Sequence, residues 1–266
     1  VHVGKKDDKG RVFVKVDGDK QVYVVAEYTA KKAGITRQRQ DEFSYQSHLK
    51  AVAAIEGGAF TAEIAPVEIP GKKGPTVVAV DESPRKDTSM DVLGKLKPAF
   101  PKDAPKDMKP EELTVTAGNA PGLSDGGSAL VVVSEAFAKA HGLNILARIT
   151  GYASGGTEPK DLFFAPILAV QNLMGKTGAT IGDYDLIEAN EAFASQALAD
   201  GDGLGWDPAR VNVNGGAIAL GHPIGSSGAR VLVTLLHALQ ERGLRTGLAT
   251  LCLGGGNAVA LSVERV

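Results

Sequence analysis

The sequence VNVNGGAIALGHPIGSSGAR, residues 211–230, decides the fold prediction. It predicts a short strand from Val211, a break at the glycine pair 215–216, and a helix after Pro223, whose fixed φ suits a helix start. His222 would then lie on a stiff loop beside the positive end of a helix, where a neutral imidazole is favoured. Taken alone, the stretch is typical of a glycine-rich strand-to-helix turn with an incidental histidine. The spacing of a phosphate-binding P-loop is absent.

Two other stretches place a chemically capable side chain where an apolar strand ends. LIEANEAFA, residues 186–194, leads from a strand to Asn190. LATLCLGGGNAV, residues 248–259, carries Cys252 in a strand that ends in three glycines. Ligands of open α/β sheets bind at this edge of the sheet. Asn190, His222 and Cys252 together are therefore more informative than any one of them.

These three blocks closely resemble signature blocks of the thiolase family, the acetyl-CoA acetyltransferase and 3-ketoacyl-CoA thiolase group. DESPRKDTS (81–89), LKPAF (96–100) and TVTAGNAPGLSDG (114–126) are similar to its loop-domain and linker blocks. The resemblance, from about residue 26 onward, implies an α/β fold: a thiolase-like α/β/α layered C-terminal domain preceded by a loop-domain remnant.

The implied domains are a leader over 1–25, read as an atypical hairpin, a loop domain on the coenzyme A side over 26–123, and a C-terminal α/β domain over 124–266. The first strand–helix unit of the last domain could belong to the sheet of a thiolase N-terminal half. That half carries the nucleophilic cysteine of thiolases, and we expect it to have no counterpart here.

Catalytic roles follow from the resemblance. Thiolases join two acyl-CoA units, or cleave 3-ketoacyl-CoA with coenzyme A, and the difficult step is to form a carbanion next to a thioester. Cys252 would be the acid/base, with a pKa lowered by positive or dipolar groups. His222 would activate the nucleophile and donate to a thioester oxygen, Asn190 would hold a water in that oxyanion hole, and the N–H of Gly254 would serve a second hole.

Substrate-binding roles are also implied only by the resemblance. Arg85 would lie against the nucleotide end of coenzyme A, where a guanidinium suits phosphate contact and stacking. Pocket-lining or tunnel positions are matched by Leu96, Ala99, Phe100, Ala117, Leu123 and Phe193. Coenzyme A and acyl-CoA are then substrates, and neither a metal nor a covalently bound cofactor is expected.

Departures from the family pattern keep other hypotheses open. Pro121 stands where a serine commonly contacts pantetheine, and Gln21 where the family commonly has histidine. These differences favour the alternative of a non-catalytic, thiolase-like subunit that binds acyl-CoA or a partner. A third hypothesis is a hydrolase or lyase that uses His222 and Cys252. The bulky residues 162–164 would shorten an acyl pocket or belong to the core.

Composition narrows the protein class. The 266 residues are 43% hydrophobic, with a formal net charge of −2, which gives no sign of a nucleic-acid or acidic-membrane partner. One cysteine excludes an internal disulfide and suits a reducing compartment. Without an apolar run of about 20 residues, we expect a cytoplasmic protein. It would form a homo-oligomer or pair with a complementary thiolase N-terminal half.

Local patterns give further expectations. A helix from residue 26 would end at Gly34, and Thr36 would cap a second helix that reaches about residue 55. Its inner positions would include Phe43, Leu49 and Val52, with His48 on the surface. A strand is expected at 130–133, followed by a short helix, and then strands that alternate with helices around a sheet covered on both faces.

Overall fold

The protein is represented by a computed structural model that describes residues 2–3, 14–16, 20–21, 24–99, 101, 108–122 and 124–266. The helices and strands, in chain order, are β1 (His2–Val3), β2 (Val14–Val16), β3 (Lys20–Gln21), α1 (Val25–Ala33), α2 (Arg37–Glu56), β4 (Val67–Ile69), β5 (Thr76–Val78), α3 (Met90–Gly94), α4 (Glu135–Ala140), β6 (Ala147–Gly156), α5 (Ala165–Thr177), β7 (Leu186–Ala189), α6 (Ala194–Leu204), α7 (Ala217–Leu220), α8 (Ser227–Glu241), β8 (Thr246–Leu253) and β9 (Asn257–Arg265). Short 3-10 turns lie at η2 (Pro110–Glu112), η3 (Pro159–Phe164), η4 (Ile181–Asp183) and η5 (Pro208–Arg210).

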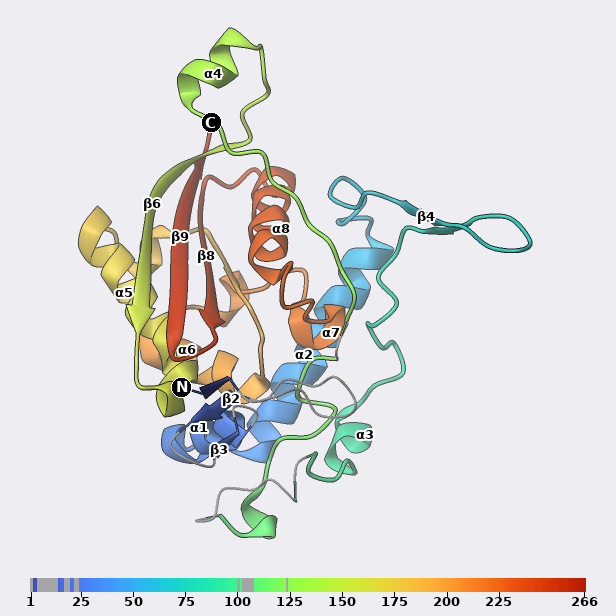
Figure 1. Ribbon diagram of the computed structural model, residues 1–266, viewed down its shortest axis with the longest axis vertical. Helices are drawn as coiled ribbons and strands as arrows, with labels where there is room; N and C mark the ends of the chain where they lie inside the picture. Colours follow the sequence, from blue (N-terminus) through green and yellow to red (C-terminus); the bar gives the residue numbers. More distant parts are fainter. Residues whose placement is uncertain are drawn as a thin grey trace.

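A four-stranded mixed sheet organises the C-terminal part, in the order β6-β9-β8-β7. β7 and β8 are parallel, whereas β9 is antiparallel to both of its neighbours. Helix α5 packs on one face and α8 on the other (Figure 1). The predicted α/β fold with a sheet covered on both faces is confirmed.

Close helix packing explains two glycines of β6. A Cβ on Gly155 would lie 2.4 Å from the backbone nitrogen of Ala169 in α5, and one on Gly151 would lie 2.8 Å from Leu173 Cδ1. Both glycines therefore let α5 approach the strand more closely than a larger residue would allow.

Helices α1 and α2 end and begin as predicted. Gly34 has a φ of 66° at the C-terminus of α1, and the Thr36 hydroxyl accepts a hydrogen bond from Arg39 N at the start of α2. The predicted inner face of α2 is wrong, because Leu49 is 44% exposed and Phe43 and Val52 are only half-buried. The buried face is largely polar and consists of Gln40, Asp41, Ser44, Ser47, His48, Ala51 and Ala54.

Two predicted strands are not strands in the structure. Residues 130–133 are extended but outside the named strands, although the predicted helix follows them as α4. Of the stretch 211–216, only Val211 makes a bridge, to Ile187 of β7. The helix that follows β7, α6, begins at Ala194, and the short helix α7 lies in the stretch after the glycine pair 215–216.

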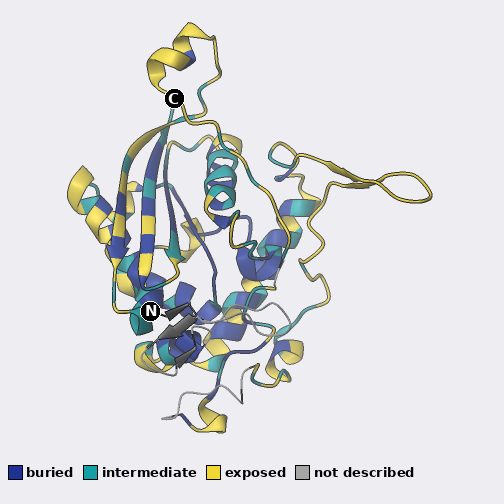
Figure 2. Ribbon diagram, viewed as in Figure 1, coloured by how far each residue is buried: buried dark blue, intermediate teal, exposed yellow. Residues whose placement is uncertain are grey.

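Two parts extend from the body of the molecule and are largely exposed (Figure 2): the β4–β5 hairpin and the segment around α4. Near the N-terminus, β2 and β3 pair antiparallel, and the expected turn at 17–19 lies outside the described residues. Within the described part of the chain, no helix combines the length and apolar character needed to cross a bilayer.

Candidate active site

The carboxyl ends of β7 and β8 bring two predicted catalytic residues to one edge of the sheet. Asn190 follows β7 directly, and its backbone N–H donates to the carbonyl of Thr250 in β8 at 3.0 Å. Cys252 lies two residues further along β8. Parallel pairing of these strands therefore positions both residues where ligands of α/β sheets bind.

His222 reaches Asn190 from the loop between α7 and α8. Its Nε2 lies 3.3 Å from Asn190 Nδ2. Gly221 before it has a φ of 98°, and a Cβ there would lie 2.2 Å from Ser124 Oγ, so only glycine fits. Burial, and next the charge of Arg230, lower the pKa of His222. A neutral imidazole therefore contacts a buried amide.

The amide oxygen of Asn190 is buried and, among the described residues, has no hydrogen-bond partner. Buried amide oxygens are nearly always satisfied by protein or ordered water. This atom is therefore free to accept a hydrogen bond from a water or a ligand at the sheet edge.

Cys252 lies in an apolar environment formed with the loop that follows Asn190. It packs against a buried cluster that includes Leu162 and Phe163 and is bordered by Phe193. The rings of Phe163 and Phe193 are 5.4 Å apart. Of the two interpretations of residues 162–164, the structure supports the core role for Leu162 and Phe163, and it places that core beside the thiol.

The prediction that the surroundings lower the pKa of Cys252 is wrong in this structure. Burial, followed by the charge of Asp200, raises the pKa of this thiol to about 12. Removing the thiol from water disfavours the thiolate, and a nearby carboxylate adds to that effect. Cys252 is therefore a thiol, not a thiolate, at neutral pH.

Alkylation kinetics test this protonation state without interference, because Cys252 is the only cysteine in the chain. We expect iodoacetamide to modify the folded protein at pH 7–8 at least roughly tenfold more slowly than the urea-unfolded chain. The rate should rise without an inflection below about pH 10, since thiolate formation limits it. A plateau near pH 8 would contradict the raised pKa.

Gly254 lies in the exposed turn that joins β8 to β9, two residues after Cys252. The structure therefore brings Asn190 to His222, and it packs Cys252 against the same cluster as Phe193, a residue predicted to bind the substrate. The short segment 190–193 links the two pairs.

Glu191 fixes the segment 190–193, although the sequence analysis assigned this residue no role. Its carboxylate is buried and accepts hydrogen bonds from Ser47 Oγ at 2.8 Å, from Asn212 Nδ2 at 2.9 Å and from Ile218 N at 3.0 Å. Gly216 packs so closely that a Cβ there would lie 2.2 Å from the carboxyl carbon. One side chain thus ties α2, α7 and the loop after β7 together.

Asn212 replaces the expected strand beside β7. Its side chain accepts from Ala189 N at 2.9 Å and donates to Ala189 O at 2.8 Å, as a neighbouring strand would do. Its φ of 45° lies in the left-handed region, which asparagine tolerates better than most residues. Two features of the sequence could have indicated this arrangement. One is Asn212, three residues before the glycine pair 215–216, and the other is the polar face of α2 that carries Ser47.

A second buried carboxylate beside the site gives a pH-dependent stability. Glu188 of β7 lies 3.3 Å from Arg230, and burial raises its pKa to about 8. The folded protein holds this proton more tightly than the unfolded chain does. Its contribution is full below about pH 4.5 and is lost as the pH rises through 8. We expect a loss of about 5 kcal/mol over that range in urea unfolding. Glu188→Gln should flatten the dependence of unfolding free energy on pH, whereas Glu42→Gln, at an exposed position, should leave it unchanged. Equal pH profiles for the two variants would refute the role of Glu188.

Residues predicted to line the coenzyme A tunnel are partly brought together. The backbone N–H of Ala99 donates to Val115 O at 2.8 Å, and Pro98 bridges to Thr116, so the 96–99 segment lies along the 115–118 segment. Leu96 lies against Gly118, the residue after Ala117, because a Cβ on Gly118 would lie 2.6 Å from Leu96 Cδ1. Phe100 and Leu123 lie outside the described residues.

Arg85 is exposed, and its loop is anchored by a histidine that was expected on the surface. His48 is buried, and its Nδ1 accepts a hydrogen bond from Arg85 N at 3.2 Å. The prediction for His48 is wrong because α2 buries its polar face against loops, whose backbone groups need polar partners. The side chain of Arg85 stays accessible to a ligand.

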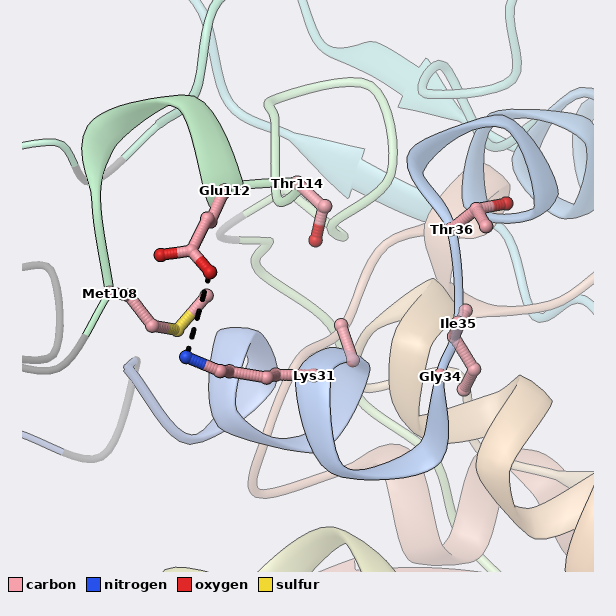
Figure 3. Close-up of a pocket in the computed structure, with 8 residues that line it drawn as sticks. Lys31, Gly34, Ile35, Thr36, Met108, Glu112 and Thr114 are labelled. Atoms are coloured by element: carbon pink, nitrogen blue, oxygen red, sulfur yellow. Dashed lines mark ion pairs between the residues drawn. The ribbon is translucent and has the colours of Figure 1, made fainter.

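A cavity of about 200 Å³ lies away from these residues, at the junction of α1 and α2 (Figure 3). It is lined by Ala30, Lys31, Gly34, Ile35, Thr36, Met108, Glu112 and Thr114. An ion pair of 3.7 Å between Lys31 and Glu112 spans it. None of the predicted catalytic or coenzyme A residues lines this cavity.

The structure combines a mixed α/β sheet with an amide and a thiol at the ends of two parallel strands and an imidazole on a nearby loop, and the family can now be stated. The family described as "Thiolase, C-terminal domain" matches residues 143–265, and "Thiolase, N-terminal domain" matches residues 9–136. This chain belongs to the thiolase family.

Similar proteins agree with this assignment. Acetyl-CoA acetyltransferase of Pseudomonas aeruginosa is 53% identical over 248 residues, which cover 93% of this chain and 61% of that protein. The crystal structure of the Bacillus anthracis acetyl-CoA acetyltransferase matches with a TM-score of 0.89 at 41% identity, covering 99% of this chain and 66% of that one. Human mitochondrial 3-ketoacyl-CoA thiolase in complex with CoA matches with a TM-score of 0.82 at 38% identity, covering 92% and 59%.

The expectation that the thiolase N-terminal half has no counterpart is wrong, because the N-terminal domain family matches residues 9–136. Sequence reasoning compared short catalytic blocks, and the block with the nucleophilic cysteine was not among those it found. The match also includes residues 9–25, which were read as an unrelated leader. The chain spans about three fifths of the length of its curated relatives.

Proposed function

We propose that the protein acts as an acyl-CoA C-acyltransferase of the thiolase type. It would condense acetyl-CoA units or cleave 3-ketoacyl-CoA with coenzyme A. The observation that carries this proposal is the contact of His222 with buried Asn190 at the end of β7, beside the strand that holds Cys252. That edge gathers a base, a hydrogen-bond donor and a thiol.

The proposed chemistry centres on the α-proton of an acyl-CoA thioester. The thiolate form of Cys252 would remove this proton, and the thiol so formed would return it, while the negative charge moves to the thioester oxygen. His222, once its Nε2 has taken up a proton, and a water held by Asn190 would donate hydrogen bonds to that oxygen. Gly254 N–H would serve the oxyanion of an acyl-enzyme. Donors arranged in advance stabilise such charges, each by about 3–4 kcal/mol.

Coenzyme A would enter along the loop-domain residues. The side-by-side segments with Leu96, Ala99 and Ala117 support a pantetheine path, and exposed Arg85 suits the nucleotide phosphates. We propose Phe100, Leu123 and Phe193 for the same substrate path. The substrate would be acyl-CoA, and no metal or covalently bound cofactor is required.

Cys252 is the one cysteine in the 266 residues, and the proposed mechanism uses it as the acid/base. The test therefore separates proton transfer from acyl transfer. Exchange of the acetyl protons of acetyl-CoA with D2O requires only the proposed acid/base and oxyanion hole, whereas acetoacetyl-CoA cleavage also requires an acyl acceptor. We expect exchange by the purified chain, and His222→Ala or Asn190→Ala should abolish it.

A non-catalytic subunit that binds acyl-CoA is the second candidate. Pro121 favours it, because proline provides neither a hydroxyl nor a backbone N–H for pantetheine. Acyl-CoA binding by calorimetry without proton exchange would support this candidate over the enzyme. Exchange that survives loss of both His222 and Cys252 would exclude the proposed roles.

We also propose that the protein is cytoplasmic and self-associates. Val131 and Val132 are 85% and 69% exposed, and Tyr152 on β6 is 72% exposed. Helix α8 also leaves Leu232 and Leu236 only half-buried, although they pack against the core, and exposed apolar surface of this kind is typical of an interface. We expect light scattering to show a dimer or larger species. Val131→Lys with Val132→Lys should shift it toward the monomer. A wild-type protein that stays monomeric at about 50 µM would contradict this, because a dimer with a Kd of about 1 µM would be largely associated there.

A further inference from the structure

Ser227, the first residue of α8, contacts both the catalytic histidine and the main chain before the helix. The residue is buried, and its Oγ lies 2.6 Å from His222 Nδ1 and 3.0 Å from the carbonyl oxygen of Pro223. A hydroxyl has a single hydrogen to donate. Of these two contacts, Ser227 can therefore donate in one and must accept in the other.

The second ring nitrogen of His222, Nε2, decides the direction of the two hydrogen bonds of Ser227. His222 Nε2 faces Asn190 Nδ2, which only donates, so Nε2 accepts. A neutral imidazole has one N–H, and it must then be on Nδ1. Nδ1–H donates to Ser227 Oγ, and the Ser227 hydroxyl donates to Pro223 O. All three hydrogen bonds are satisfied by this one tautomer.

We propose that Ser227 is a positioning residue that holds His222 as the Nδ1–H tautomer, with the Nε2 lone pair directed to the active site. This inference rests on the proposed function, in which His222 takes up a proton at Nε2 and donates a hydrogen bond from there to the thioester oxygen. When a thiol gives its proton to Nε2, the S–H bond breaks, the N–H bond forms, and the sulfur keeps the electron pair. The Nδ1–H bond to Ser227 need not change during that step.

The charges around His222 oppose its protonation, so a hydrogen-bond acceptor such as Ser227 would help to stabilise the imidazolium. Arg230 of α8 opposes a positive charge on His222, and Arg230 itself lies 3.3 Å from the carboxyl group of Glu188 in β7. A hydrogen-bonded chain from Nδ1 through Ser227 to the Pro223 carbonyl ends on an acceptor, so it favours the imidazolium that forms when Nε2 takes up a proton. Ser227 thus keeps the ring oriented and offsets part of the effect of Arg230.

The first test reads the tautomer directly by NMR of protein labelled with ¹⁵N-histidine, with His222→Asn used to assign the His222 signals. At pH 8 the wild type should show a protonated Nδ1 and an unprotonated Nε2. Ser227→Ala should shift His222 toward the Nε2–H form, whereas Ser226→Ala, one residue away with no side-chain capping bond, should not. A wild-type Nε2–H tautomer, or unchanged signals in Ser227→Ala, would overturn the proposal.

The second test measures acetyl-CoA proton exchange. Ser227→Ala should lower kcat by roughly 10- to 100-fold, the effect expected for one hydrogen bond to a charged group, with KM nearly unchanged. It should also move the lower inflection of the pH profile to lower pH. Ser227→Thr, which keeps the hydroxyl, should restore most of the rate. Equal kcat values for Ser227→Ala and Ser226→Ala would refute the role. If even the wild type fails to exchange, the proposed function fails, while the NMR result still decides the tautomer.

Discussion

Replacing Cys252 with alanine is expected to reduce acetyl-CoA proton exchange by roughly 10²- to 10⁴-fold, the usual contribution of a positioned general acid or base. In its thiolate form, Cys252 is the group at this strand end that would take up the α-proton and then return it, since His222 would be engaged at the thioester oxygen. Proton NMR of acetyl-CoA in D2O measures the rate directly.

Two features make the result interpretable. Leu253→Ala changes the next residue of β8, which is exposed, and should retain most of the exchange activity. The alanine variant at 252 should keep the far-UV circular dichroism and melting temperature within a few degrees of wild type, because a small side chain replaces a small one. Wild-type exchange by a folded Cys252→Ala protein would remove the thiol from the mechanism.

Replacing Glu191 with alanine should cost about 3–5 kcal/mol of unfolding free energy, the range for loss of a buried, fully hydrogen-bonded charge. Three donors, on Ser47, Asn212 and Ile218, would lose their acceptor in a site closed to water. Urea unfolding, followed by circular dichroism at constant m value, measures the loss. Proton exchange should also fall, since Glu191 fixes the segment that carries Asn190.

The matched controls separate charge from shape. Glu191→Gln keeps the shape and one acceptor oxygen, so it should cost clearly less than the alanine variant. Glu42→Ala, on the exposed side of α2, should change the unfolding free energy by less than about 0.5 kcal/mol. If Glu191→Ala loses no more stability than Glu42→Ala, the buried network does not hold the site together.

Local signals in the sequence were sufficient for much of the fold. Gly34 and Thr36 predicted a helix end and a helix start because caps act within one turn of backbone. The apolar runs of β7 and β8 predicted strands because both faces of a covered sheet are buried. The position of Asn190 and Cys252 at one edge followed from the way such strands pair.

Contacts between distant segments could not be predicted in the same way. The polar face of α2 is buried because Glu191, 144 positions beyond Ser47, needs donors. Val211 makes only a bridge because the Asn212 side chain satisfies β7 in place of a strand. In both cases, side chains from distant segments provide the hydrogen bonds that buried polar groups need. The alternation of apolar residues along a strand therefore does not reveal these contacts.

The sequence by itself determined the family resemblance, the α/β class and the residue types at the strand ends, since these depend on short blocks and local backbone preferences. Only the tertiary structure decided the protonation of Cys252 and the hydrogen-bond direction through His222. A pKa or a tautomer depends on burial and on the partners supplied by segments that are far apart in the chain. Asp200 beside Cys252 and Ser227 beside His222 are such partners.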